Sequence, residues 1–195
     1  MAQDVRHHHR RRSLNRQVIV AAARRVADSS GLAELTLRRV AGELGTGQAS
    51  LYRHIADRAE LLGLLAEDLA TGFPLEGGRS GADGVVRQWE AMHDYLADHP
   101  WGARVIAEGF HTAAGGHAVA EHNLALLRAA GLDDTDAARA YRALWHLLLG
   151  HLLNEHPLGH DGEKDLGAPD FSWALRRLVT GMTDCPDLPC GNAIR

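Results

Sequence analysis

The chain has 195 residues, and its 45% share of hydrophobic residues is ordinary for a globular protein with a substantial core. Its two cysteines, Cys185 and Cys190, lie in one Pro-containing segment, which excludes a disulfide framework as the basis of the fold. The apolar runs are too short or too interrupted for a secretory signal or a transmembrane helix. We therefore expect a cytoplasmic, soluble protein without a membrane partner.

Charge is distributed unevenly along the chain. The net charge is −4, yet residues 1–60 contain eleven arginines and six acidic residues, whereas residues 61–195 contain ten basic and nineteen acidic ones. A basic first part joined to an acidic remainder indicates a polyanion-binding module attached to a module with another function. Chance clustering of charge is the alternative.

The first thirty residues divide into two predicted segments. Residues 1–12 are polar, basic and without periodicity, and we interpret them as a flexible arm. A helix is predicted from 13 to 30, because apolar side chains recur there at helical spacing. Ser13 is expected to be its N-cap and Gly31 its end.

Residues 35–68 contain the most specific pattern in the chain, which is two short helices that meet at a glycine. Thr36 is expected to cap the first helix, and Gly45 is expected to supply the positive φ at its exit. The apolar residues of this helix follow the spacing i, i+3, i+4 and i+7: Leu37, Val40, Ala41 and Leu44. This spacing predicts a helix that buries one stripe.

The second helix of the pair is too short to be stable by itself. Leu51 and Ile55 lie one turn apart, and we expect them to hold it on a scaffold. The remaining polar side chains point elsewhere: Gln48, Ser50, Tyr52, Arg53 and His54. A short, braced helix with a polar outer face is typical of a helix-turn-helix that enters the major groove of DNA.

The rest of the chain is predicted to be helical as well. A fourth helix begins near Asp57, and the glycines and proline of 72–78 break the pattern. Further amphipathic stretches follow at 82–98, 101–113, 116–130, 134–155 and 170–183. No segment alternates with period two, so the sequence predicts an all-α fold. An N-terminal three-helix helix-turn-helix DNA-binding domain (13–60) precedes a larger helical domain (61–184) and a loose tail (185–195).

The last two predicted helices carry more apolar surface than one core-facing stripe. The helix at 134–155 is apolar almost all round, and the helix at 170–183 has a continuous apolar stripe. We expect them to form a four-helix interface in a homodimer through Tyr141, Leu144, Leu148, Leu152, Phe171, Leu175, Leu178 and Met182. Two ordinary core helices are the alternative.

Residues 35–68 closely resemble the DNA-binding segment of the TetR family of bacterial repressors. The resemblance rests on Leu-Thr-x-Arg from Leu35, Val-Ala-x-x-Leu-Gly from Val40 and Ser-Leu-Tyr-x-His from Ser50, followed by Arg58 and two leucines. Weaker similarity to the tetracycline-repressor branch extends over 74–77, 99–105, 127–132 and 149–150. It implies that the domain at 61–184 binds an effector and dimerises.

The resemblance implies a set of DNA-binding residues. They are Thr36, Arg38, Gln48, Ala49, Ser50, Tyr52, Arg53, His54 and Arg58. By the resemblance, Arg38 reaches base edges, whereas Thr36, His54 and Arg58 anchor phosphates. The residue types agree, because arginine suits guanine, glutamine suits adenine and a small apolar alanine suits the thymine methyl group. Arg53 stands where this branch usually has an aromatic residue, so we expect a different operator sequence.

The expected effector pocket departs from the branch. Its magnesium-binding histidine corresponds to Ile106, which has no lone pair. The threonine and arginine of the branch's release mechanism correspond to Gly109 and Phe110, and its acidic metal-linked residue corresponds to Asn154. We therefore expect no cofactor and no metal, but a more apolar small-molecule effector of unknown identity. The pocket is expected to comprise Trp89, Met92, His93, Trp101, Ile106, Phe110, Leu127 and Trp145.

The resemblance thus implies a homodimeric transcriptional repressor that binds a pseudo-palindromic operator in double-stranded DNA and is released by an effector. One alternative is a ligand-independent or activating DNA-binding regulator. A more remote one is a metal-dependent enzyme, because histidine and glutamate lie one turn apart at 117 and 121 and at 151 and 155. No nucleophile and base can be paired from spacing, so no catalytic residue is predicted.

Overall fold

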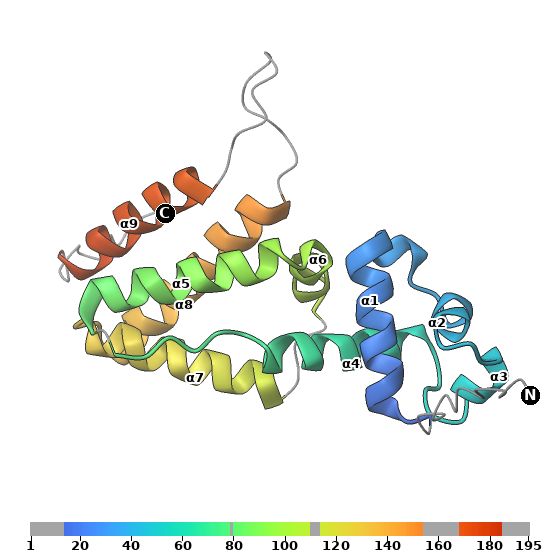
Figure 1. Ribbon diagram of the computed structural model, residues 1–195. Helices are drawn as coiled ribbons and strands as arrows, with labels where there is room; N and C mark the ends of the chain where they lie inside the picture. Colours follow the sequence, from blue (N-terminus) through green and yellow to red (C-terminus); the bar gives the residue numbers. More distant parts are fainter. Residues whose placement is uncertain (1–13, 79, 110–113, 154–167, 185–195) are drawn as a thin grey trace, which may run out of the picture. The chain divides into compact units, whose positions relative to one another are not determined.

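The computed structural model describes residues 14–78, 80–109, 114–153 and 168–184 (Figure 1). Every regular element within these ranges is a helix, which confirms the predicted all-α fold. The helices in these ranges are α1 (Arg16–Glu34), α2 (Leu37–Glu43), α3 (Gln48–Leu51), α4 (Arg58–Thr71), α5 (Gly81–Ala97), α6 (Pro100–Ala107), α7 (Ala114–Ala129), α8 (Asp134–Leu153) and α9 (Ala168–Thr183). The chain divides into two compact units, Met1–Leu65 and Ala66–Arg195. The predicted arm (1–12) and tail (185–195) lie outside the described residues.

Both ends of α1 differ from the prediction. Its N-cap is Asn15, whose side chain accepts a hydrogen bond of 2.9 Å from the backbone N–H of Val18, whereas Ser13 lies outside the described residues. Asparagine and serine cap helices about equally well, so residue type alone does not favour Ser13 over Asn15. Gly31 has a φ of 76° and kinks the helix, which continues for one more turn to Glu34 instead of ending.

The helix-turn-helix forms as its spacing predicts. Thr36 caps α2 by accepting a hydrogen bond from the backbone of Arg39 at 3.1 Å, and Gly45 leaves the helix with a φ of 60°. α2 packs on α1 and α3 packs on α2. The core of the first unit is made of Ile19, Ala22, Ala23, Val26, Leu35, Val40, Ala41, Leu51, Ile55, Leu61 and Leu65.

The segment after α4 is held by side chains of α5. α4 begins after Asp57, whose carboxylate accepts a hydrogen bond of 2.8 Å from the N–H of Glu60, and it ends before Gly72. Beyond it, the fully buried Gln88 donates to the carbonyl of Pro74 at 2.8 Å and accepts from the N–H of Glu76 at 2.7 Å. This buried amide therefore pairs with two backbone groups where the helical pattern breaks.

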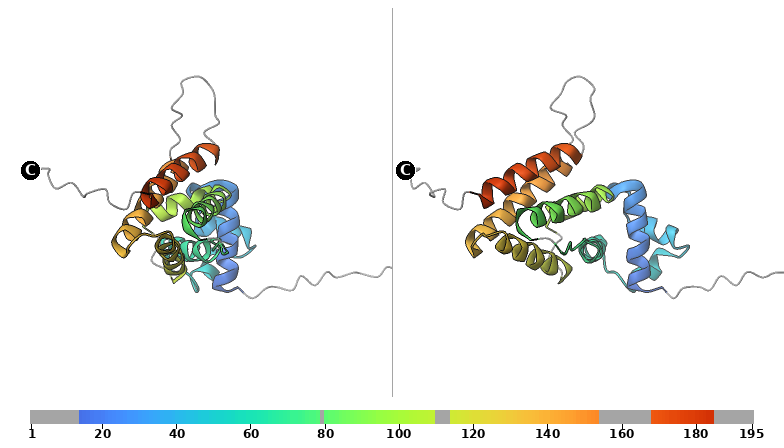
Figure 2. Two further views of the ribbon diagram at one scale, coloured as in Figure 1. Left: turned by 90° about the vertical axis from the view of Figure 1, so that its left-hand side faces the viewer. Right: turned by 60° about the vertical axis from the view of Figure 1, so that its left-hand side comes forward.

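In the second unit α5 is the central helix, because it packs against α6, α7, α8 and α9. Figures 1 and 2 show α9 alongside α5 in every view. Its buried residues therefore lie on more than one side of the helix, and they include two polar ones: Val85, Val86, Gln88, Trp89, Met92, His93 and Leu96. The remaining helices complete the core with Trp101, Val105, Val119, Leu127, Ala140, Leu144, Leu148, Phe171, Leu175 and Val179.

Helix α6 is shorter than the predicted stretch at 101–113. It ends at Ala107, and Gly109 follows with a φ of 88°. A glycine in this left-handed conformation ends a helix by turning the chain away from its axis. Within the described ranges, no helix combines the length and apolarity needed to cross a bilayer.

Candidate functional site

The outer face of α3 presents polar side chains, while its inner face is anchored. Leu51 is fully buried, whereas Gln48, Ala49 and Arg53 are exposed and Tyr52 is 52% exposed. The side-chain amide of Gln48 donates to the Tyr52 hydroxyl at 3.1 Å. The structure thus places these predicted residues together on one surface, next to the half-buried side chains of Ser50 and His54.

Regular helix ends at Leu51, earlier than the predicted continuation to Ile55. The turn nevertheless continues, because the N–H groups of His54 and Ile55 both donate to the carbonyl of Leu51, at 2.8 and 2.9 Å. Ile55 is buried and holds the end of this turn in the core. The short exposed element is therefore fixed by two buried apolar side chains one turn apart.

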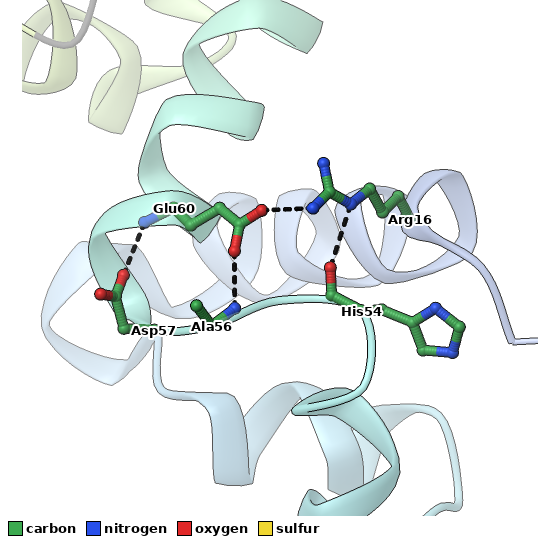
Figure 3. Close-up of polar contacts among 5 residues, drawn as sticks. All are labelled: Arg16, His54, Ala56, Asp57 and Glu60. Carbon is green, nitrogen blue, oxygen red and sulfur yellow. Dashed lines mark hydrogen bonds and ion pairs between the residues drawn. The ribbon is translucent and has the colours of Figure 1, made fainter.

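Arg16 and Glu60 form a polar network that fixes the link between α3 and α4 (Figure 3). The Arg16 guanidinium donates to the carbonyl of His54 at 3.0 Å and to one oxygen of Glu60 at 2.6 Å. The other carboxylate oxygen of Glu60 accepts from the N–H of Ala56 at 2.6 Å. The backbone N–H of Glu60 donates to the carboxylate of Asp57. Both carboxylate oxygens are thus satisfied, and α1 is tied to the link from 54 to 57.

Sequence reasoning did not find this network, although a signal for it was present. An N-cap residue followed three positions later by glutamate is the pattern of a capping box, and Asp57 and Glu60 have this spacing. The glutamate of such a box reaches back toward the start of the helix, as Glu60 does toward Ala56. Its partner Arg16 lies 44 positions away, and nothing in the sequence indicates that pairing.

Three other predicted DNA-binding residues lie around α2 and the start of α4. Arg38 and Thr36 are exposed and border an open depression in the first unit. Arg58 is exposed too, but its guanidinium donates to the carbonyls of Leu32 and Leu35, each at 3.0 Å. Arg58 therefore ties the start of α4 to the link between α1 and α2, a structural role that the sequence did not indicate.

A cavity of about 500 Å³ lies in the second unit. Its lining comes from α4, α6, α7 and α8 and from Phe73, which lies just after α4. The lining residues are Ala66, Leu69, Ala70, Phe73, Ile106, Ala107, Gly116, Val119, Tyr141, Trp145, His146 and Leu149. Two predicted pocket residues, Ile106 and Trp145, are among them. The volume lies in the range of small-molecule sites, and most of the lining is apolar.

Other predicted pocket residues lie elsewhere. Trp89, Met92, His93, Trp101 and Leu127 are buried and are not part of the cavity lining. They pack in the core instead, as a large apolar side chain on a central helix does in most proteins. The prediction for Phe110 lies outside the described residues.

Aromatic side chains pack behind and along the cavity wall on α8. The Trp145 ring meets the ring of Trp89 edge-on at 5.4 Å and that of Phe73 at 6.2 Å, measured between centroids. Tyr141, one turn from Trp145, lies 6.1 Å from Trp89. Burial raises the pKa of the Tyr141 hydroxyl, and a hydrogen bond with the Trp145 side chain opposes that rise. Tyr141 thus faces the cavity as a protonated phenol.

The residues predicted for dimerisation fall into three groups. Leu144, Leu148, Phe171 and Leu175 are buried within the single chain, and Tyr141 lines the cavity. The half-buried members are Leu152, Leu178 and Met182. A large exposed residue that the prediction missed is Trp173 on α9, which is 65% exposed and lies under the guanidinium of Arg177 at 5.9 Å. It lies on the side of α9 opposite the apolar stripe, and its sequence signal was an aromatic residue off that stripe.

The histidines do not assemble a metal cluster in the described ranges, where no three His, Cys, Asp or Glu side chains come together. His117 pairs with Glu121 at 3.1 Å, and both side chains are exposed. His93 stacks on Phe171 at 4.5 Å, and the His151 ring lies 5.2 Å from it. The predicted partner of His151 at position 155 lies outside the described residues.

Comparison with known protein families assigns the chain to a family. Residues 19–65 match the family described as bacterial regulatory proteins of the tetR family, and residues 77–182 match the tetracyclin repressor-like C-terminal domain. The chain belongs to the TetR family of transcriptional regulators. This confirms the resemblance, and with it a helix-turn-helix DNA-binding domain followed by a larger helical domain.

Individual relatives agree with this assignment. An HTH-type transcriptional regulator of Saccharopolyspora erythraea is 31% identical over 146 residues, which are 72% of this chain and 61% of the relative, so less than two thirds of the relative is matched. The structure of BioQ with its natural double-stranded DNA operator is 28% identical, has a TM-score of 0.72 and covers 88% of this chain and 99% of that one. A TetR variant from Acinetobacter baumannii AYE in complex with minocycline is 26% identical, with a TM-score of 0.74 and coverage of 89% and 99%.

Proposed function

We propose that this TetR-family regulator is a homodimeric repressor that leaves its operator when a small molecule occupies the cavity of the second unit. The observation that carries the proposal is that one helix serves both units. α4 begins in the polar network that fixes the end of the α3 turn, and its later residues Ala66, Leu69 and Ala70 line the cavity. A ligand that displaces α4 therefore acts on a helix whose first residues belong to the DNA-binding unit.

In the proposed complex, the outer face of α3 enters the major groove of the operator. Gln48 and Arg53 supply hydrogen-bonding groups for adenine and guanine, and Arg38 reaches base edges from α2. The supporting contacts to phosphates, sugars and the thymine methyl group come from Thr36, Ala49, Ser50, Tyr52, His54 and Arg58. We assign the DNA-binding domain to 13–60 and the effector-binding and dimerisation domain to 61–184.

A dimer gives the symmetry that a pseudo-palindromic operator requires. We assign its contact surface to α8 and α9, where Leu152, Leu178 and Met182 are half-buried in the single chain and Trp173 is exposed. Two heads in one dimer would read half-sites about 34–36 Å apart, one turn of B-DNA. The operator complex of BioQ supports the DNA partner, and the minocycline complex of the TetR variant supports a small-molecule partner.

Release follows from linkage between the two sites. Ligand and operator favour different arrangements of the same dimer, so each lowers the affinity for the other by an equal factor. A preference of the ligand for the released arrangement of roughly 2–4 kcal/mol is enough for a large change in DNA occupancy. A regulator that does not respond to ligands would instead keep its operator affinity whatever occupies the cavity.

The test is a titration of small molecules against the operator complex of wild-type protein and two variants. Leu149→Trp fills the cavity, and Leu75→Trp adds the same side chain at an exposed position outside the lining. We expect a molecule that releases the wild-type protein and Leu75→Trp from DNA to leave Leu149→Trp bound. Equal release of all three proteins would contradict the assigned cavity, and no release by any molecule would favour the ligand-independent regulator.

A further inference from the structure

The chemistry of the cavity wall restricts what can occupy it. Among the described residues that line it, none is Asp, Glu, Lys or Arg, and the ionisable members are Tyr141 and His146. Moving a charged ligand from water into such a wall costs several kcal/mol unless a partner charge is present. A molecule that this wall stabilises is therefore one without net charge.

The shape of the side chains favours a flat molecule. α4, α6 and α7 contribute the small residues Ala66, Ala70, Ala107 and Gly116, whereas Phe73, Tyr141 and Trp145 contribute rings. Small side chains allow a ligand to approach the helix backbone closely, and aromatic rings pack against another ring at 4.5–7 Å. The Trp145 ring is itself held edge-on by Trp89, so its position does not depend on the ligand.

Tyr141 adds one directional group to this apolar wall. Tyr141 lines the cavity one turn of α8 before Trp145, and the centroids of the two rings are 6.3 Å apart. A hydrogen bond from the Trp145 indole N–H, which can only donate, uses the Tyr141 oxygen as the acceptor and leaves the Tyr141 proton available. No other hydrogen bond of the Tyr141 side chain occurs among the residues that the structure describes. A ligand that accepts a hydrogen bond here satisfies a hydroxyl group that is largely removed from water.

We infer that the cavity takes an uncharged, flat aromatic molecule that carries a ring carbonyl, and that the Tyr141 hydroxyl donates to this carbonyl oxygen. The inference rests on the proposed function only in assigning the cavity to the effector. It makes Tyr141 the residue that discriminates between aromatic molecules with and without an acceptor oxygen. Two α8 residues then have different parts in binding, because Trp145 supplies ring contact and Tyr141 supplies the hydroxyl that donates to the ligand.

The test uses three probes that share one ring skeleton: 9-fluorenone, fluorene and 9-fluorenone-2-carboxylate. Their affinities for the full chain are measured by calorimetry or by quenching of tryptophan fluorescence. We expect fluorenone to bind roughly three- to tenfold more tightly than fluorene, which is the effect of one hydrogen bond. The carboxylate is expected to bind at least about tenfold more weakly than fluorenone, because the described wall has no Lys or Arg to pair with it.

Two tyrosine variants identify the hydroxyl responsible. In Tyr141→Phe we expect the affinity for fluorene to be unchanged, which shows an intact cavity, and the preference for fluorenone to disappear. The control Tyr95→Phe removes a hydroxyl of the same unit that donates to the Leu69 carbonyl and does not line the cavity, and it should keep the preference. Equal binding of fluorenone and fluorene to wild-type protein, a preference that survives in Tyr141→Phe, or no binding of either probe would overturn the inference.

Operator binding is measured on the same protein samples, so two failures can be told apart. A protein that binds its operator and is released by a molecule of another class would retain the proposed function while the inference on ligand class fails. A protein that binds no operator would contradict the proposed function, and the comparison of fluorenone with fluorene would still measure the role of Tyr141.

Discussion

The two candidate sites of this protein differ in the polarity of their side chains. In the first unit, amide, hydroxyl and guanidinium groups are exposed on the face of α3, and the ion pair between Arg16 and Glu60 fixes the link that follows. In the second unit, the described cavity wall has no Asp, Glu, Lys or Arg and depends on rings such as those of Tyr141 and Trp145. Polar and charged groups that bind a polyanion remain exposed to solvent, whereas a pocket that binds a small ligand is largely apolar and loses its water when the ligand enters.

The comparison is sharpest on α8, which has a core face and a cavity face. Leu144 is fully buried on the core face. Leu144→Ala is therefore expected to lower the free energy of unfolding by about 2–5 kcal/mol. Urea denaturation at several protein concentrations measures this. If Leu144 belonged to the subunit interface instead, the loss would depend strongly on protein concentration and would vanish at high concentration.

In the first unit, replacing a base-reading group should affect binding without affecting folding. Gln48→Ala is expected to cost about 1–3 kcal/mol of operator binding and to relax the base preference at one position in each half-site. Its side chain is exposed, so the free energy of unfolding should change little. Competition between the operator and a scrambled duplex measures the effect. An equal loss for both duplexes would remove Gln48 from base recognition.

Glu60 offers a test in which electrostatics and positioning predict opposite signs. Removing a negative charge from a DNA-binding unit ordinarily strengthens DNA binding. Glu60→Gln, however, loses the ion pair with Arg16 that fixes the carbonyl of His54, so we expect operator binding to weaken by about 0.5–1.5 kcal/mol. The matched control is Glu34→Gln, which removes an exposed carboxylate with no role in this network and should leave operator binding equal or tighter.

The outcome for Glu60→Gln is measured by fluorescence anisotropy at two salt concentrations. A positioning role predicts weaker binding with a similar dependence on salt, because the number of phosphate contacts is unchanged. Tighter binding in both glutamate variants would show that Glu60 acts only through its charge, and the network in Figure 3 would then have no part in DNA recognition.

The smallest expected effect concerns His151 at the packing of α5, α8 and α9. Burial lowers the pKa of His151, the nearby His93 lowers it further, and Asp170 opposes both. The unfolded chain therefore binds a proton here more readily than the folded one, so the contribution to stability is complete above pH about 6.5 and is lost as the pH falls below it. The unfolding temperature, measured between about pH 7.5 and about pH 5.5, should decline less steeply in His151→Gln than in wild type. The exposed control His117→Gln should leave the decline as it is, and an unchanged profile in His151→Gln would contradict this assignment.

Local patterns in the sequence were enough to predict the helix-turn-helix. The spacing of Leu37, Val40 and Ala41, the cap at Thr36 and the glycine at 45 all act within one or two turns, and the structure has each of them. Boundaries were less certain where two local signals competed. Asn15 and Ser13 are equivalent caps by residue type, so the sequence alone did not identify Asn15 as the cap.

The cavity could not be predicted in the same way, because its wall combines residues from four helices between 66 and 149. A buried stripe on one helix looks the same in sequence whether it faces a neighbouring helix or an empty volume. Trp89 and Trp145 illustrate this, since both are aromatic, both were assigned to the pocket, and only Trp145 lines it. Similarly, Leu144 and Leu148 had the apolarity of an interface but lie in the core of one chain.

Selection of bound sequences from a random library of duplex DNA tests the central claim most directly, namely that the polar face of α3 recognises bases. We predict enrichment of a two-fold symmetric site whose half-sites are about one helical turn apart, and loss of one base preference in each half-site when Gln48→Ala is used in the same selection. Recovery of no sequence above the starting library at moderate salt would contradict it.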